Sequence, residues 1–180
     1  GKISYFLKKK FDANRVQINW IGGEDQSSLV LGNGRPFFAK IINPKKRNRL
    51  LRKFSDLDTV SLSELRKLSV QPKGTVPFKS EVSITIDTKK FITSSALKKL
   101  NILKNAEIMN YSKDKRNNLK RIYDVHYKKL GKTTFLLDLF MDGGIPIKSF
   151  VQNSDLTPNI SELLENQCIC KKLDFKNIVV

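Results

Sequence analysis

Residues that build metal centres, disulfide frameworks and membrane spans are scarce in this sequence. Only two cysteines and one histidine occur among its 180 residues, too few for an ordinary zinc site. No stretch approaches the ~20 consecutive apolar residues of a transmembrane helix. The opening GKISYFLKKKF mixes charged and apolar residues and has no apolar signal-peptide core. We therefore expect a folded protein without a metal site or a membrane span.

The few residues of chemical interest outside the loops are interpreted as structural. Cys168 and Cys170 are separated by one residue in a predicted strand, so they lie on one face of it. Neighbouring thiols in that arrangement do not suit an ordinary disulfide, and we expect reduced thiols in an intracellular protein. His126, in YDVHYKKL, is interpreted as a residue of another strand rather than as a catalyst.

Positive charge is the strongest signal in the composition. Lys and Arg number 34 against 17 Asp and Glu, a formal net charge of +17. Such a charge favours a polyanionic partner, with RNA or DNA ahead of a membrane surface. An AT-rich genome would also raise the lysine count, but it does not explain the clustering at 8–10, 45–53 and 113–121. The side chains expected to contact RNA phosphates are Lys45, Lys46, Arg47, Arg49, Arg52, Lys115 and Arg116.

Alternation of apolar and polar residues predicts more strand than helix. Strands are predicted over 15–21, over 76–86, on both sides of Gly131 and over 168–180, and 29–42 is predicted as strand, glycine turn and strand. Helices are predicted over 2–12, 44–54, 94–100, 146–153 and 157–166, the last with Thr157 as its N-cap. With no repeat or long linker, residues 1–180 are expected to form one α+β domain built mainly on antiparallel sheet.

A glycine-rich acidic loop is the first candidate site. In WIGGEDQSSLVLGNGRPF, Gly22 and Gly23 precede the acidic pair Glu24 and Asp25. A carboxylate on such a loop is exposed yet held, which is how a nucleophile or general base is presented on a rigid scaffold. An ordinary polar turn has the same spacing, and spacing alone favours that simpler interpretation.

Two further segments contain side chains with alternative roles. Lys148 lies in a short apolar helix, IKSFV, where it either extends to water or pairs with a buried carboxylate and keeps it ionised. Phe78 opens an alternating strand, where an aromatic ring serves either as a core residue or as a stacking surface for a base, typically worth ~1–3 kcal/mol. The residue pattern leaves both pairs of alternatives open.

Two of these segments together resemble a known family. GGED-QSSL-V-LGNGRPF is similar to GRED-x-D-x-R-x-LG-x-GRPF of the archaeal and eukaryotic tRNA T-arm pseudouridine synthases (tRNA pseudouridine 54/55 synthase). GGIPIKSFVQNSDLTPNISELL resembles their G-x-Y-I-K-E-F-V-x-G-D-x-x-x-T-x-P-x-I-x-x-L-L, in the same order along the chain. The resemblance implies a pseudouridine synthase core, a mixed sheet crossed by an RNA-binding cleft, that works without a cofactor. The family's N-terminal THUMP-containing domain is expected to be absent from this chain.

The resemblance also implies roles for single residues. Asp25 matches the catalytic aspartate, and Lys148 matches the basic residue that pairs with it. Phe78 matches an aromatic residue, usually Tyr, that stacks on the uridine. Arg35 matches the Arg of GRPF, which supports the catalytic loop or contacts RNA. Asp25 and Lys148, distant in sequence, are therefore predicted to meet as an ion pair in one cleft.

The chain departs from the family pattern at several positions, which keeps other functions open. Gly23, Ser27, Leu29 and Pro146 replace the Arg, Asp, Arg and Tyr of the signatures, and Ser154 replaces a Gly. The expected function is isomerisation of uridine in the T-arm of tRNA, by a monomer in the nucleus or cytoplasm. The alternatives are a catalytically silent relative that binds or chaperones RNA, and an unrelated basic RNA-binding protein.

Overall fold

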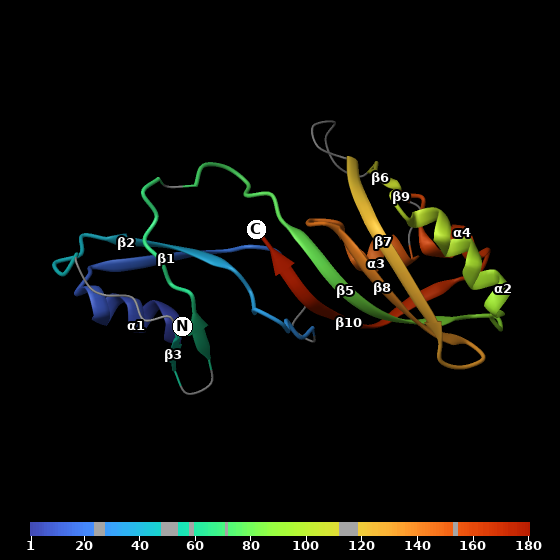
Figure 1. Cartoon of the computed structure of the whole chain (residues 1–180), viewed down its shortest axis with the longest axis horizontal. Coiled ribbons are helices and arrows are strands. Elements are labelled where there is room, and N and C mark those ends of the chain that lie inside the picture. Colours follow the sequence, from blue (N-terminus) through green and yellow to red (C-terminus); the bar gives the residue numbers. More distant parts are fainter. Residues whose placement is uncertain (24–27, 48–53, 58–59, 71, 112–118, 153–154) are drawn as a thin grey trace. The chain divides into compact units, whose positions relative to one another are not determined.

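The computed structural model describes residues 1–23, 28–47, 54–57, 60–70, 72–111, 119–152 and 155–180 (Figure 1). The chain, expected from its sequence to form one domain, divides into two compact units. Unit 1 comprises residues 1–21 and 36–76, and unit 2 comprises residues 22–35 and 77–180. No helix in these described ranges is long and apolar enough to cross a membrane.

Unit 1 is a helix packed on short antiparallel strands. The helix α1 (Lys2–Phe11) is followed by β1 (Arg15–Trp20), which pairs with β2 (Phe37–Ile42), and β3 (Phe54–Asp56) pairs with β4 (Ser61–Ser63). Ile3 and Leu7, four residues apart on one face of α1, are buried together with Leu62 of β4. The predicted helix over 2–12 and strand over 15–21 are thereby confirmed.

The prediction of a helix over 44–54 is wrong at both ends of that range. Residues 44–47 are not helical, and Phe54 begins β3 instead of ending a helix. Leu50 and Leu51, expected on its buried side, lie outside the described residues. An apolar pattern this short fits a strand as well as a helix, and at Phe54 the pairing with Ser63 decides for the strand.

Unit 2 is built on an antiparallel sheet. In its described part the strands follow the order β10-β5-β8-β7-β6-β9, and neighbouring strands in this order run antiparallel. The strands are β5 (Lys79–Thr88), β6 (Glu107–Asn110), β7 (Leu119–Lys129), β8 (Thr134–Asp142), β9 (Leu156–Thr157) and β10 (Cys168–Val179). The predicted hairpin around Gly131 is confirmed as β7 and β8, and the closing strand as β10.

The core of unit 2 lies on one face of this sheet. Alternate residues of β5 and β8 are almost completely buried, as with Ile84 and its cross-strand partner Leu137. Helices cover this face: η1 (Lys98–Leu103) packs against β7, and α3 (Ile147–Gln152) packs against β10. At about 1.5–3 kcal/mol for each fully buried aliphatic or aromatic side chain, this layer is the main source of stability in unit 2.

The predicted short helices are present, but their caps differ from the expectation. The helix α2 (Ser94–Leu97) is capped by Thr93, whose hydroxyl accepts from the Ala96 amide at 3.0 Å, instead of by a serine. The helix α4 (Ile160–Leu164) is capped by Asn159, which accepts from the Glu162 amide, instead of by Thr157. Both kinds of residue are favourable N-caps, so the sequence alone does not choose between neighbouring ones.

Candidate active site

The ring of Phe78 is the point where the two sequence motifs meet. Phe78 is half-buried and directly precedes β5. A Cβ placed on Gly22 would lie 3.4 Å from the ring, and a Cβ placed on Gly143 would overlap it. The Gly143 amide also donates to the Phe78 carbonyl at 2.7 Å. Gly22 opens the loop that contains Asp25, and Gly143 opens the segment that contains Lys148, so both segments start against one aromatic ring.

The two glycines are required there for different reasons. Gly22 has a φ of +76°, a left-handed backbone conformation that residues other than glycine rarely adopt. Gly143 has no such φ, but the ring of Phe78 occupies the space that its side chain would need. Glycines stand in both sequence motifs, but no local pattern predicts that they contact the same ring.

Arg35 connects the two ends of the acidic loop. Its guanidinium donates a hydrogen bond to the carbonyl of Gly22, thirteen residues earlier, and its side chain is half-buried. The loop over 22–35 is therefore closed at its base by a charged donor. This contact favours support of the loop as the role of Arg35, and both that role and a contact with RNA stay predictions.

The return part of the loop does not form the strand predicted over 29–31. β1 pairs with β2 from Arg15↔Ile42 to Trp20↔Phe37, so residues 21–36 are the connection between them. Within this connection Val30 makes a single parallel bridge to Phe175 of β10. The loop thus returns along the edge of the unit 2 sheet, a contact between segments 145 residues apart that no local pattern predicts.

Lys148 lies on the exposed side of α3. Ile147 and Phe150 of this helix are buried, and the Phe150 amide donates to the carbonyl of Pro146 at 2.9 Å. Lys148 is exposed, which follows from its place among these apolar residues on a short helix. Asp25 lies outside the described residues, so the ion pair between Asp25 and Lys148 stays a prediction.

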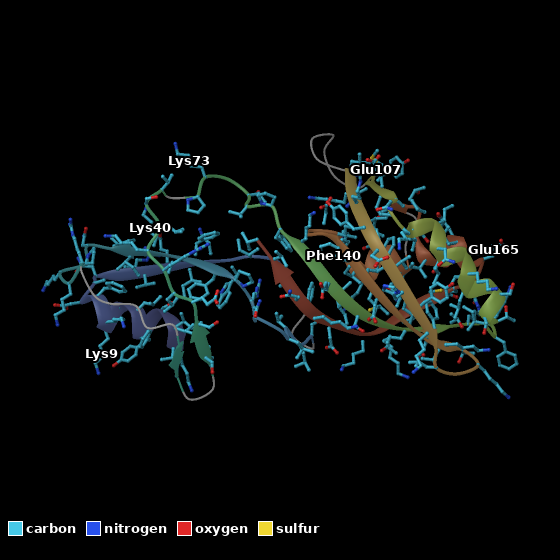
Figure 2. The ribbon with its side chains drawn as sticks, viewed as in Figure 1. Lys9, Lys40, Lys73, Glu107, Phe140 and Glu165 are labelled. Atoms are coloured by element: carbon cyan, nitrogen blue, oxygen red, sulfur yellow. The ribbon has the colours of Figure 1, made fainter. Side chains whose placement is uncertain are left out.

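Two of the basic clusters adjoin in unit 1. The amides of Lys45 and Lys46 donate to the carbonyls of Asp12 and Phe11, at the end of α1 where Lys8–Lys10 lie. Lys45, Lys46 and Arg47 are exposed. Nearby, a groove of about 590 Å³ runs over α1, and Figure 2 shows Lys9 extending from this helix. Of the other predicted RNA contacts, Arg49, Arg52, Lys115 and Arg116 lie outside the described residues.

The residues interpreted as structural have structural surroundings. His126 is exposed and contacts Asp124 at 3.1 Å, a carboxylate that Lys104 also approaches at 3.1 Å. Cys168 and Cys170 are free thiols, as expected, with Cys168 buried. Burial raises the pKa of the Cys168 thiol to about 11. A protonated, buried thiol is a poor nucleophile.

Alkylation should separate the two cysteines. At pH 8 we expect iodoacetamide to modify Cys170 in the folded protein and to leave Cys168 unmodified, because Cys168 is buried and its pKa of about 11 keeps it as the thiol. Peptide mass spectrometry measures the two sites separately. In guanidinium chloride both should react, which is the control, and equal rates in the folded protein would contradict the buried position of Cys168.

The comparisons with known proteins agree with the resemblance found in the sequence. The model of the family described as Pus10, C-terminal, matches residues 1–179. The chain is 41% identical over its whole length to the tRNA pseudouridine synthase Pus10 of Nitrosopumilus maritimus, covering 47% of that protein. It is 34% identical to the protein of the same name in Cenarchaeum symbiosum, covering 44% of it. The chain thus spans about half the length of the curated relatives it matches.

Solved structures support the fold. A chain of the archaeal box H/ACA sRNP Nop10-Cbf5 complex matches 98% of this chain with a TM-score of 0.54 at 9% identity, over 42% of its own length. A chain of a Cbf5-Nop10-Gar1 complex matches 96% with a TM-score of 0.53, also at 9% identity, over 43% of its length. The predicted α+β pseudouridine synthase core, with mainly antiparallel sheet and a few helices, is confirmed.

Proposed function

The chain belongs to the Pus10 C-terminal family, and from this premise we propose that it isomerises uridine to pseudouridine in tRNA. The observation that carries the proposal is the family match over residues 1–179. The position of Phe78 supports it independently, because a ring that contacts both Gly22 and Gly143 adjoins the two segments that contain Asp25 and Lys148. An aromatic ring in this position can stack on a base.

The reaction breaks the bond between the base and C1′ of the sugar, rotates the base, and rejoins it to C1′ through C5. The proton on C5 leaves, and N1 gains a proton, so the product is an isomer of the substrate. A base inside a folded RNA arm must first be flipped out of its stack, and Phe78 supplies a ring on which it can stack. Asp25 acts as nucleophile at the sugar or as general base.

Lys148 and Arg35 support this chemistry electrostatically. A carboxylate in a closed pocket tends to take up a proton unless a cation is near, and the ammonium of Lys148 would keep Asp25 ionised. Arg35 holds the carbonyl of Gly22 and so fixes the start of the loop. No metal or organic cofactor takes part in this scheme.

The substrate is proposed to be the T-arm of tRNA, bound by a monomer in the nucleus or cytoplasm. The exposed Lys45, Lys46 and Arg47, beside Lys8–Lys10 at the end of α1, form a basic surface for phosphates. Each phosphate that such a surface neutralises releases counterions, so binding should weaken steeply with salt.

Release of the C5 hydrogen tests the proposed function. The complete protein is incubated with a tRNA transcript containing uridine tritiated at C5, and tritium in the solvent is counted. We expect release that stops at one or two equivalents per tRNA and is absent from a transcript whose T-arm uridines are replaced by cytidine. Tight binding of tRNA without tritium release would instead identify a silent relative, and release from uridines outside the T-arm would contradict the proposed substrate.

A further inference from the structure

Asp174 contacts the acidic loop from the middle of β10. Its Oδ1 accepts a hydrogen bond from the Leu29 amide at 3.1 Å, and its Oδ2 lies 2.7 Å from Nζ of Lys172. The side chain of Asp174 is only 16% exposed, although it is charged and belongs to a sheet edge. Both oxygens of this carboxylate are therefore engaged, one with a neighbour on its own strand and one with the loop.

The bond to Leu29 extends a short ladder between the loop and β10. The Phe175 amide donates to the Leu29 carbonyl at 2.8 Å, and the Leu31 amide donates to the Phe175 carbonyl at 2.8 Å. The carboxylate of Asp174 adds the third rung, and among the amides of this ladder the Leu29 amide is the nearest to Asp25 in sequence. Leu29 follows Asp25 by four residues in the sequence.

Apolar packing contributes little to holding this part of the loop. Leu29 and Leu31 are 55% and 50% exposed and Val30 between them is half-buried, so backbone hydrogen bonds are needed to hold the segment. A hydrogen bond to an ionised acceptor is roughly twice as strong as one between neutral groups. The carboxylate of Asp174 thus adds a charged acceptor to a ladder whose other two bonds join neutral backbone groups.

We propose that Asp174 is a positioning residue, which fixes the return part of the loop through the Leu29 amide and so sets where Asp25 stands. The inference rests on the proposed function. Arg35 bonds to Gly22 and Asp174 bonds to Leu29, so a charged side chain anchors the described chain before the acidic segment and another anchors it after that segment. Holding a reacting group in place matters because a displacement of about 1 Å can cost roughly 100-fold in rate.

Asp174 remains ionised under the conditions in which tRNA is handled. The hydrogen bond from Lys172 is the main cause that lowers the pKa of Asp174, and the Leu29 amide lowers it further. A carboxyl group whose pKa is lowered on folding contributes its stabilisation above its ordinary pKa and loses it only as the pH falls below that value. Removing the contact therefore requires a substitution rather than a change of pH in the neutral range.

Three variants of the complete protein test the proposal. In D174A the Leu29 amide loses its acceptor, and we expect kcat for tritium release to fall between about 10- and 100-fold with KM for tRNA within about twofold. In D174N the side-chain amide oxygen can still accept from Leu29, so part of the activity should return. K172A is the matched control, because it removes the ion pair but leaves the Leu29 bond, and its kcat should equal that of the unmodified protein.

Hydrogen exchange at Leu29 gives a second readout that general destabilisation would not reproduce. We expect the Leu29 amide to exchange at least about tenfold faster in D174A, with exchange in β5 and β8 unchanged. Unchanged kcat in D174A, or an equal loss in K172A, would overturn the proposal. If the unmodified protein released no tritium, the proposed function would fail separately, and exchange at Leu29 alone would decide whether Asp174 holds the loop.

Discussion

Replacing Asp25 with Asn should reduce the rate of pseudouridine formation by more than about 10⁴-fold while the Kd for tRNA changes less than about threefold. The substitution keeps the size of the side chain and removes its negative charge, so the residue can neither attack the sugar nor accept a proton. We expect phosphate contacts on the proposed basic surface to provide most of the affinity, and this substitution leaves them unchanged. Single-turnover tritium release measures the rate, and filter binding measures the Kd.

Glu24 offers a matched control for this experiment, because it is the neighbouring carboxylate in the same loop. Glu24→Gln removes the same charge one residue away and should leave the rate within about threefold of the unmodified protein, because the resemblance to the family assigns the catalytic role to Asp25 and not to Glu24. An Asp25→Asn protein that turns over normally would remove Asp25 from the mechanism. Equal losses in both variants would show that loop charge, rather than the position of Asp25, controls the reaction.

The parts of the fold that the sequence predicted are those encoded by local patterns. Along β5, alternation of apolar and polar residues from Val82 to Asp87 specifies strand and buried face together. Gly131 lies in the turn of the predicted β7–β8 hairpin. The wrong predictions concern segments whose structure depends on a distant partner or whose local pattern is ambiguous. Residues 29–31 have an apolar pattern like that of a strand, but their partner is Phe175, and no local pattern identifies a partner so distant. Phe54 was assigned to a helix because a short apolar pattern is ambiguous.

In the candidate site, too, local patterns identified single residues, whereas contacts between distant segments decide how those residues are arranged. Asp25, Lys148, Phe78 and Arg35 were selected from motifs, but their mutual positions depend on packing. That Gly22 and Gly143 meet the same ring follows from the approach of two segments about 120 residues apart. Asp174 was not predicted at all. The available signal was weak, an acidic residue between Leu173 and Phe175 in a strand, and many exposed strand residues would fit that description.

Substituting Gly143 with Ala should disable the site through the ring of Phe78. The new Cβ would overlap the ring, so either the ring or the backbone of the 143–148 segment must move. Overpacking of this kind typically costs about 1–3 kcal/mol of stability. Because the displaced ring is the proposed stacking surface and the displaced backbone leads to Lys148, we expect a loss of kcat/KM of about 100-fold or more. Urea unfolding measures the loss of stability, and tritium release measures the loss of kcat/KM.

Gly144 and Phe78 provide the controls that assign this loss to the ring. A Cβ on Gly144 meets nothing within 4 Å, but the φ of +89° makes Gly144→Ala strained, so it should cost about 1–2 kcal/mol of stability with little loss of kcat/KM. Phe78→Ala makes room for the new methyl group. In the Gly143→Ala background it should therefore destabilise less than it does alone, a coupling that a double-mutant cycle measures. Strictly additive free energies would show that the overlap is relieved elsewhere and that the ring of Phe78 does not connect the two motifs.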